Sequence, residues 1–323
     1  MPWPDHLHNA YLNTQVLVTG GAGFIGSHLV DALVSLGARV RVIDDLSNGL
    51  ASNLEQHARS AVDVVEASIL DDAALKGAMA GCSHVFHQAA LGSVPMSVER
   101  PADFHDVNTT GTLRVLEAAK AGGAVKRIVY AGSSSAYGDA AALPKREDML
   151  PAPLSPYATS KLAGEYLMQS HAACYPIQTI SLRYFNIFGP RQRPDSAYAA
   201  VIPAFAAALK ANEQPLIFGD GEQTRDFTYV ENAVFANLLA GASKHHLSGE
   251  VVNVAAGERY SLRELLSTMA ELLQTEATFK SMPARTGDVQ HSQADITRAR
   301  ELLGYHVRVS FRAGLRATLE GFS

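Results

Sequence analysis

Short apolar runs alternate with amphipathic segments along the first half of the chain. Runs of Val, Leu and Ile predict buried strands, whereas apolar residues spaced three and four apart predict helices that cover them. The predicted strands span 15–19, 38–44, 61–67, 84–88 and 126–131, and the predicted helices span 24–36, 71–79, 102–121 and 156–174. This alternation predicts an α/β fold with a doubly wound parallel sheet that has helices on both faces.

Three glycines stand between the first predicted strand and the first predicted helix. Gly20, Gly23 and Gly26 have the spacing of a dinucleotide-binding turn, in which the backbone approaches a pyrophosphate at a helix N-terminus. Asp44 ends the second predicted strand, where a carboxylate can accept the ribose hydroxyls. A 2′-phosphate would meet the negative charges of Asp44 and Asp45, so we expect NAD rather than NADP.

The pattern changes after Asn186, where shorter elements and longer connections follow a Gly- and Pro-rich loop at 189–194. A length of 323 residues suits one large or two modest domains. We therefore predict a Rossmann-type NAD-binding domain over 1–185 and a smaller α/β substrate domain over 186–323. Part of 229–243 is an alternative contributor to the first domain, and residues 1–14 are expected to be a polar N-terminal extension.

Composition narrows the class of protein. The chain is 47% hydrophobic and 18% charged, which indicates a globular core, and its net charge of −5 gives no reason to expect a nucleic-acid partner. Both cysteines fall in predicted helical regions, which indicates reduced thiols. With no membrane-length apolar run and no signal-peptide core, we expect a cytoplasmic protein without a membrane partner.

Candidate catalytic residues lie on either side of the loop at 139–155. Ser133 and Ser134 follow a predicted strand, at the edge of the sheet where ligands bind in such folds. Tyr157 and Lys161 are four apart at the start of a predicted helix and share one face of it. The set resembles the Ser-Tyr-Lys triad of short-chain dehydrogenases.

These residue types suit proton transfer to or from a carbinol. A phenol with a pKa near ~10 is a poor base at neutral pH. The positive charges of Lys161 and of a nicotinamide ring favour the phenolate of Tyr157, while Ser133 can donate a hydrogen bond to the reacting oxygen.

Longer stretches extend this similarity over residues 16–305. They cover 87–95, 133–138, 154–157, 182–189, 197–203, 219–227 and 287–295. Together they resemble the extended short-chain dehydrogenase/reductases and, within them, the UDP-N-acetylglucosamine 4-epimerases of bacterial surface-polysaccharide pathways, in the UDP-hexose 4-epimerase family. The resemblance implies NAD-dependent, reversible C4 epimerisation of a UDP-hexose, UDP-GlcNAc to UDP-GalNAc, through a transient 4-keto intermediate.

The resemblance also implies roles for individual residues. Those expected at the cofactor are Gly20, Gly23, Phe24, Ile25, Gly26, Asp44, Asn48, Ser68, Ile69, Gln88, Ala89, Leu91, Asn108, Tyr157, Lys161 and Tyr184. Those expected at the UDP-sugar are Gly92, Ser93, Ser133, Asn186, Ala200, Val201, Arg225, Arg285, Asp288 and Ser292. Arg225 and Arg285 suit a diphosphate because guanidinium forks match phosphate oxygens. Ala67 and Ser68 depart from the Gly-Asp of related epimerases, which puts a carboxylate contact to the adenine in doubt.

The sugar is the least constrained part of this prediction. Relatives restricted to UDP-glucose and UDP-galactose resemble this chain but carry a tyrosine at the position of Ser292, so the serine favours an N-acetylated sugar. UDP-glucose/UDP-galactose and UDP-uronic acid epimerisation stay open as alternatives. Dehydratases and decarboxylases resemble the chain too, but they have an acid at the position of Ser135. A non-catalytic NAD-binding protein is the remaining alternative.

Two further predictions concern assembly and metals. The helices 102–121 and 156–174 resemble the pair through which this family forms a four-helix dimer interface. They carry apolar residues beyond one sheet-facing stripe, which indicates a homodimer: Leu113, Leu116, Ala119, Leu162, Tyr166 and Leu167. His84 and His87 are three apart in a predicted strand and face opposite sides, so we expect no metal site.

Overall fold

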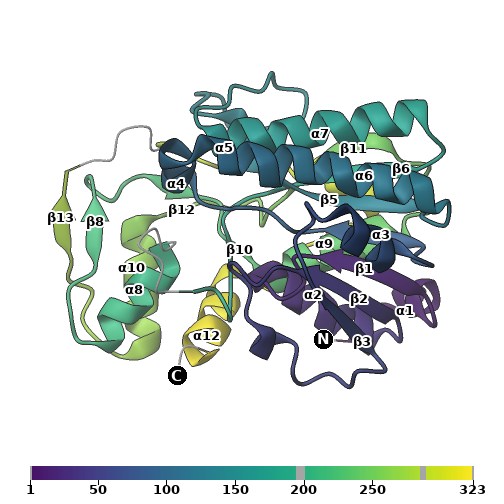
Figure 1. Ribbon diagram of the computed structural model, residues 1–323. Coiled ribbons are helices and arrows are strands. Elements are labelled where there is room, and N and C mark those ends of the chain that lie inside the picture. Colours follow the sequence, from purple (N-terminus) through teal and green to yellow (C-terminus); the bar gives the residue numbers. More distant parts are fainter. Residues whose placement is uncertain (1, 194–200, 284–288, 322–323) are drawn as a thin grey trace.

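Seven parallel strands form the central sheet of the computed structural model, which describes residues 2–193, 201–283 and 289–321 (Figure 1). The strand order is β11-β6-β5-β4-β1-β2-β3. The bounds are β1 Gln15–Thr19, β2 Arg39–Asp44, β3 Val62–Glu66, β4 His84–His87, β5 Arg127–Ser133, β6 Gln178–Tyr184 and β11 Ser248–Val254. The prediction of a doubly wound α/β fold is confirmed. The strand β11, which comes from the region after residue 186, was not predicted.

Helices cover both faces of this sheet because successive side chains of a strand point to opposite sides. Val16 and Val18 belong to the core of one face and Leu17 to that of the other. The first face is covered by α1 (Asp5–Tyr11), α2 (Phe24–Ser35), α9 (Val230–Ala242) and α11 (Thr297–Leu303). The second is covered by α3 (Asp72–Met79), α6 (Gly111–Gly122) and α7 (Pro156–Cys174). Helix α9 packs against α2 and β5 although it lies in the second half of the chain.

The helix predicted over 102–121 is interrupted. It consists of α5 (Pro101–Phe104), the π-helix η2 (His105–Thr110) and α6. Asn108 lies in the π-helix with only 1% of its surface exposed. Such wide turns often occur at functional sites, and this one directs Asn108 toward the loop after β4.

The N-terminal segment is not a polar extension, so that prediction is wrong. Residues 5–11 form α1, in which Leu7 and Tyr11 are fully buried against α9. The Tyr11 hydroxyl donates a hydrogen bond of 2.7 Å to the carbonyl of Leu238. These two apolar residues, one helical turn apart, bring the segment into the core of the first face (Figure 1).

A smaller lobe lies beside the sheet on the left of Figure 1. Its core is formed by α8 (Val201–Lys210), α10 (Leu262–Leu273) and α12 (Phe311–Gly321). Short strand pairs border it: β7 (Ile187–Phe188) with β10 (Thr228–Tyr229), β9 (Thr224–Arg225) with β12 (Tyr260–Ser261), and β8 (Leu216–Phe218) with β13 (Lys280–Met282). The remaining elements are α4 (Val94–Glu99) and the two 3-10 turns η1 (Ala51–Asn53) and η3 (Ser134–Tyr137).

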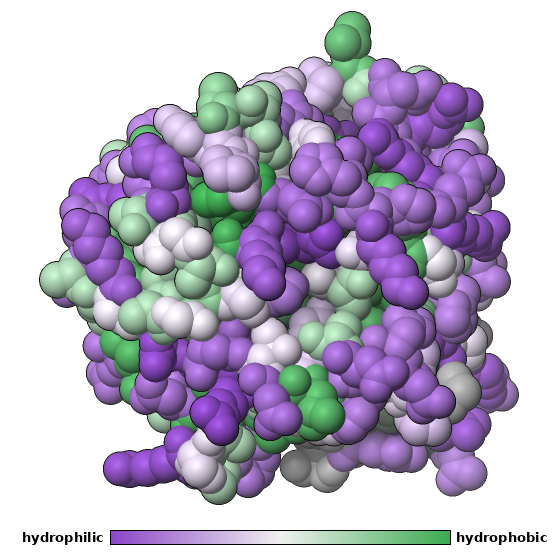
Figure 2. Space-filling view, turned by 90° about the vertical axis from the view of Figure 1, so that its right-hand side faces the viewer, coloured by the Kyte–Doolittle hydropathy of each residue, from purple (hydrophilic) through white to green (hydrophobic). Residues whose placement is uncertain are grey.

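One face of the molecule has a mainly hydrophilic surface. Figure 2 shows one end of the molecule, on which apolar side chains form small separate patches among polar ones. Among the helices of the described ranges, none combines the length and apolar character needed to cross a membrane.

Candidate active site

The glycine turn joins β1 to α2 with very little space around its backbone. Gly20 has a φ of +68°, and a Cβ atom there would lie 2.7 Å from Cα of Ala89. A Cβ at Gly26 would lie 2.1 Å from the carbonyl oxygen of Gly20, so this glycine allows helix and strand to pack closely. Gly23 precedes the first turn of α2, in which no side chain caps the backbone N–H groups of Phe24 and Ile25. This geometry fits the pyrophosphate of a dinucleotide.

Asp44 lies at the end of β2, beside the glycine turn. One carboxylate oxygen accepts the N–H of Ala22 and the other that of Leu46, both at 2.9 Å. Each oxygen keeps a further lone pair for a ribose hydroxyl, although burial raises the pKa of this carboxyl. Arg41 on the same strand points away and pairs with Asp63 at 2.9 Å, so it does not neutralise a 2′-phosphate at Asp44. The residues therefore fit NAD.

Other predicted cofactor residues surround this turn. Asn48 is exposed in the loop after β2, and the Ser68 hydroxyl accepts the N–H of Leu70 at 3.2 Å. Ile69 is buried against the Gly111 backbone, since a Cβ at Gly111 would lie 2.5 Å from its side chain. The side-chain amide of Asn108 binds the backbone of Leu91 twice: its oxygen accepts the Leu91 N–H at 2.8 Å, and its nitrogen donates to the Leu91 carbonyl at 3.1 Å. Its amide also donates to the hydroxyl of Ser160 in α7 at 3.0 Å.

A buried histidine, His87, lies at the end of β4 and connects it to β1 and α6. The His87 ring lies between the hydroxyls of Thr19 and Thr112, at 2.7 and 2.9 Å. Burial lowers its pKa to about 3, so the ring is neutral at physiological pH. The Thr19 hydroxyl also accepts the N–H of Ala89 at 3.2 Å. No local sequence pattern predicts this network, because Thr19 and Thr112 lie far from His87 along the chain.

Three side chains form a closed ring of hydrogen bonds next to it. Gln88 donates to Asn237 at 3.1 Å, Asn237 donates to the Tyr184 hydroxyl at 2.6 Å, and this hydroxyl donates to Gln88 at 3.2 Å. Gln88 and Tyr184 were predicted at the cofactor, but Asn237 was not. It comes from α9, which reaches the sheet from a distant part of the sequence.

The three triad residues meet at the carboxyl end of β5. Burial raises the pKa of Tyr157, and the side chain of Ser133 opposes this rise. Lys161 is 3% exposed, and its Nζ atom lies 4.3 Å from the centre of the Tyr130 ring. Burial lowers the pKa of Lys161 to about 7, against the attraction of Glu165. Ser134 is the partly buried first residue of η3.

Sequence reasoning also missed a buried ion pair behind Lys161. Glu165 lies one turn further along α7 and is 1% exposed. It binds Arg183 of β6 through contacts of 2.8 and 3.0 Å. This pair fixes α7 to the sheet at the level of the triad.

The predicted UDP-sugar residues that follow β6 and lie in the described ranges come from separate segments: Asn186, Val201, Arg225 and Ser292. Arg225 donates to the carbonyls of Thr224 and Gln290, at 3.0 and 3.3 Å. Ser292 is 9% exposed, and its N–H donates to the Thr224 carbonyl at 3.0 Å. Asn186 has a φ of +37° in the turn after β6. Val201 opens α8 and is half-buried, while three predicted residues lie outside the described ranges: Ala200, Arg285 and Asp288.

Asp226, which was not predicted, ties these segments together. It is fully buried and accepts the N–H groups of Ala256, Gly257 and Ala294, at 3.0, 3.1 and 3.1 Å. On the other side of the site, Gly92 faces open space and the Ser93 hydroxyl caps α4 by accepting the N–H of Met96 at 3.3 Å.

Comparison with known proteins gives consistent matches. A family model described as the NAD dependent epimerase/dehydratase family matches residues 16–255. A UDP-glucose 4-epimerase of Mycolicibacterium smegmatis is 40% identical over 312 residues, which cover 95% of this chain and 98% of that protein.

Solved structures agree in fold over almost the whole chain. A UDP-N-acetylglucosamine 4-epimerase from Methanobrevibacter ruminantium, in complex with UDP-N-acetylmuramic acid, matches with a TM-score of 0.92 and 37% identity over 96% of this chain and 98% of that one. A UDP-glucose 4-epimerase from Thermus thermophilus in complex with NAD matches with a TM-score of 0.86 and 33% identity over 96% and 99%. This chain belongs to the NAD-dependent epimerase/dehydratase family, and NAD is its cofactor.

Proposed function

We propose that this protein is a UDP-sugar 4-epimerase that interconverts UDP-GlcNAc and UDP-GalNAc. The observation that carries the proposal is the meeting of Ser133, Tyr157 and the buried Lys161 at the sheet edge that also bears the glycine turn. Matches to epimerases over almost the whole chain support the reaction class.

Tyr157 is the group that takes the proton of the C4 hydroxyl and later returns it. Ser133 donates a hydrogen bond to the same oxygen and keeps it in line with the phenol. Burial alone favours the neutral phenol, so the phenolate needs a nearby positive charge. The nicotinamide ring of NAD, when bound, would supply that charge and the hydride-accepting centre for C4.

Inversion at C4 requires the ketose to turn while its UDP part stays in place. Arg225, in a segment fixed by Asp226, is suited to hold the diphosphate during this turn. Arg285 and Asp288 are proposed to assist from the segment outside the described ranges. The proposed mechanism requires that the sugar itself is not clamped rigidly, so that both faces of C4 can be presented to the cofactor.

The product decides between this reaction and its rivals. Incubation with UDP-GlcNAc should give a product of unchanged mass with inverted C4, without accumulation of reduced cofactor. Loss of water or carbon dioxide would instead establish a dehydratase or decarboxylase. The hydroxyl at Ser135 argues against these, because they need an acid there for the later proton transfer.

The preference for an acetylated sugar rests on Ser292. Its small side chain leaves volume that a tyrosine would fill, and overlap with an N-acetyl group costs on the order of 1–3 kcal/mol or more. Ser292→Tyr should abolish turnover of UDP-GlcNAc and spare UDP-glucose, whereas the control Ser292→Ala should keep both. Comparison of kcat/KM for UDP-GlcNAc, UDP-glucose and UDP-glucuronic acid tests this. An unchanged rate with UDP-GlcNAc in the tyrosine variant would show that Ser292 does not gate the pocket.

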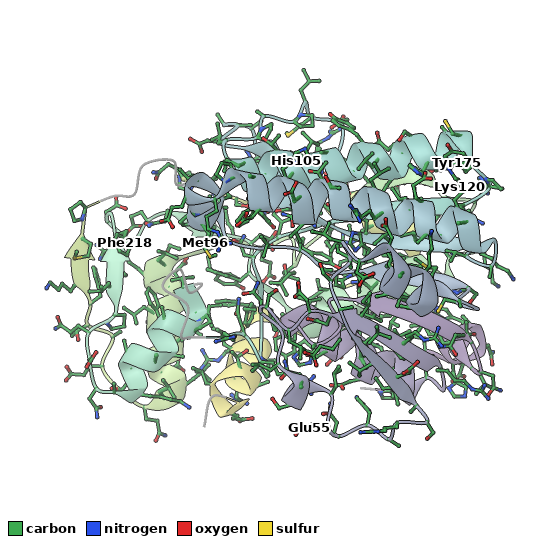
Figure 3. The ribbon with its side chains drawn as sticks, viewed as in Figure 1. Glu55, Met96, His105, Lys120, Tyr175 and Phe218 are labelled. Carbon is green, nitrogen blue, oxygen red and sulfur yellow. The ribbon has the colours of Figure 1, made fainter. Side chains whose placement is uncertain are left out.

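We also propose a homodimer through α6 and α7, which lie side by side with Lys120 and Tyr175 at their ends (Figure 3). Leu113 and Tyr166 are 40% and 53% exposed on these helices and suit a contact with a second copy. Leu116 and Ala119, however, belong to the core of the chain itself, so their assignment to the interface is withdrawn. Sedimentation of only monomer at micromolar concentration would overturn the proposal.

A further inference from the structure

Ser135 lies outside the Ser-Tyr-Lys set but contacts its serine twice. The N–H of Ser135 donates to the Ser133 hydroxyl oxygen at 3.2 Å, and the two hydroxyl oxygens are 2.7 Å apart. The 3-10 turn η3 fixes both contacts, because Ser133 is its N-cap and Ser135 its second residue. Ser133 is therefore held by one neighbour before any substrate arrives.

The hydrogen bonds available to Ser133 can be counted. A serine hydroxyl has one proton to donate and two lone pairs that accept. The N–H of Ser135 occupies one lone pair. The second lone pair and the proton are left for the Ser135 hydroxyl, whose oxygen is 2.7 Å away, and for the hydroxyl of Tyr157, whose pKa the Ser133 side chain lowers.

These two partners allow two arrangements, which differ in the protonation of Tyr157 and in the direction of the bonds. With a protonated Tyr157, the phenol donates to Ser133, and Ser133 donates to Ser135. With an ionised Tyr157, Ser135 donates to Ser133, and the Ser133 proton points to Tyr157 and the reacting oxygen. Only a residue that both donates and accepts at position 135 satisfies both arrangements, and the two serine hydroxyls need only rotate when Tyr157 gains or loses its proton.

We infer that Ser135 is a positioning residue whose hydroxyl turns the Ser133 proton toward Tyr157 and the reacting oxygen. The inference rests on the proposed epimerase function and on the proposed role of Ser133. An acid at the same position, as in the dehydratases and decarboxylases, cannot take this role while it is ionised, since a carboxylate accepts but does not donate.

The test uses a matched pair, Ser135→Thr and Ser135→Val, which differ in a hydroxyl against a methyl group. With UDP-GlcNAc, or with UDP-glucose if that proves the better substrate, the valine variant should lose about 10- to 100-fold in kcat, the effect of one hydrogen bond to a charged group. Its KM should stay within about twofold, because Ser135 acts on the ionised state rather than on binding. The threonine variant should keep most of the activity.

The pH profile adds a readout that a purely structural role would not move. The Ser133 side chain lowers the pKa of Tyr157, so losing the orientation of its hydroxyl should raise that pKa. The rising limb of kcat, which follows ionisation of Tyr157, should shift to higher pH in Ser135→Val and not in Ser135→Thr. Ser35→Ala serves as a control, because that hydroxyl donates to the Ala32 carbonyl at the end of α2, remote from the site.

A double-mutant cycle distinguishes the inference from the proposals beneath it. If Ser135 acts through Ser133, the variant Ser133→Ala/Ser135→Val should be no slower than Ser133→Ala alone. Additive losses, or equal kcat in the threonine and valine variants, would overturn the inference. Full activity in Ser133→Ala, or no epimerisation by the wild type, would instead overturn the proposed role of Ser133 or the proposed function.

Discussion

The two halves of the site are built in different ways. The cofactor half lies along one edge of a single parallel sheet, where β2, β5 and β6 end in a candidate residue and β1 and β4 are followed directly by one. The sugar-nucleotide half is assembled from short strand pairs and loops that a buried carboxylate, Asp226, ties together. The residues proposed to transfer the proton and to hold the cofactor thus belong to one continuous sheet with its helices, called the frame below, while those proposed to meet the sugar belong to separate pieces.

This difference suits the proposed reaction. Proton transfer needs Tyr157 and Ser133 in one fixed geometry, and buried groups such as His87 and Glu165 hold the elements that carry them. The sugar, by contrast, has to present both faces of C4. Changes in the frame should therefore alter kcat, and changes in the smaller lobe should alter binding.

The largest effect is expected in the frame. Tyr157→Phe removes the proton acceptor and keeps the ring, so kcat should fall by about 10²- to 10⁴-fold. The affinity for UDP, measured by calorimetry, should stay close to that of the wild type. Activity that survives the substitution undiminished would contradict a phenolate mechanism.

The burial of Lys161 in the frame should make the stability of the folded protein depend on pH. Burial lowers its pKa to about 7 in the fold, against 10.5 for an ordinary exposed lysine, so between these pH values the unfolded chain binds a proton that the folded protein releases. Stability should therefore rise with pH over this range. Lys161→Met removes this titration, so the wild type should gain on the order of 2–3 kcal/mol over the variant between pH ~7 and ~10. Urea unfolding of both proteins at several pH values measures the gain, and parallel curves would contradict it.

In the smaller lobe, the expected effect is on binding. Asp226→Ala leaves three N–H groups without their acceptor. The buried one, that of Ala294, costs about 1–3 kcal/mol if it stays unpaired, and the two partly buried ones cost less. Partial relaxation should leave a KM for the UDP-sugar raised by about 10- to 100-fold, with NAD binding unchanged. Asp226→Asn keeps the shape of the side chain, so its KM for the UDP-sugar should fall between those of the wild type and Asp226→Ala. A drop in kcat at constant KM would show that a change in the smaller lobe affects catalysis rather than binding, which contradicts this division of roles.

The smallest effect is expected far from both halves. Tyr11→Phe removes only the hydrogen bond to the Leu238 carbonyl, and should lower the free energy of unfolding by about 1 kcal/mol. Catalytic constants should not change. A measurable effect on kcat would show that contacts of α1 influence the catalytic residues.

Local patterns predicted most of the frame. The glycine turn, Asp44 and the helix that starts at Pro156 could be read from spacing and residue type, because each depends on neighbours within a few residues. The π-helix around Asn108 could not, because apolar spacing does not distinguish it from an ordinary helix turn. Asn237, Asp226 and β11 were missed for another reason: each is defined by contacts between distant segments.

The late position of α9 has a consequence for synthesis of the chain. Tyr11 and Leu238 are separated by 227 residues, so α1 is made long before its partner. Until α9 leaves the ribosome, the sheet surface that it later covers stays in water, together with the apolar side of α1. Nascent chains at this stage are aggregation-prone and suited to chaperone binding. A chain cut before residue 230 should accordingly be recovered in the insoluble fraction, even though it contains the glycine turn and the whole triad.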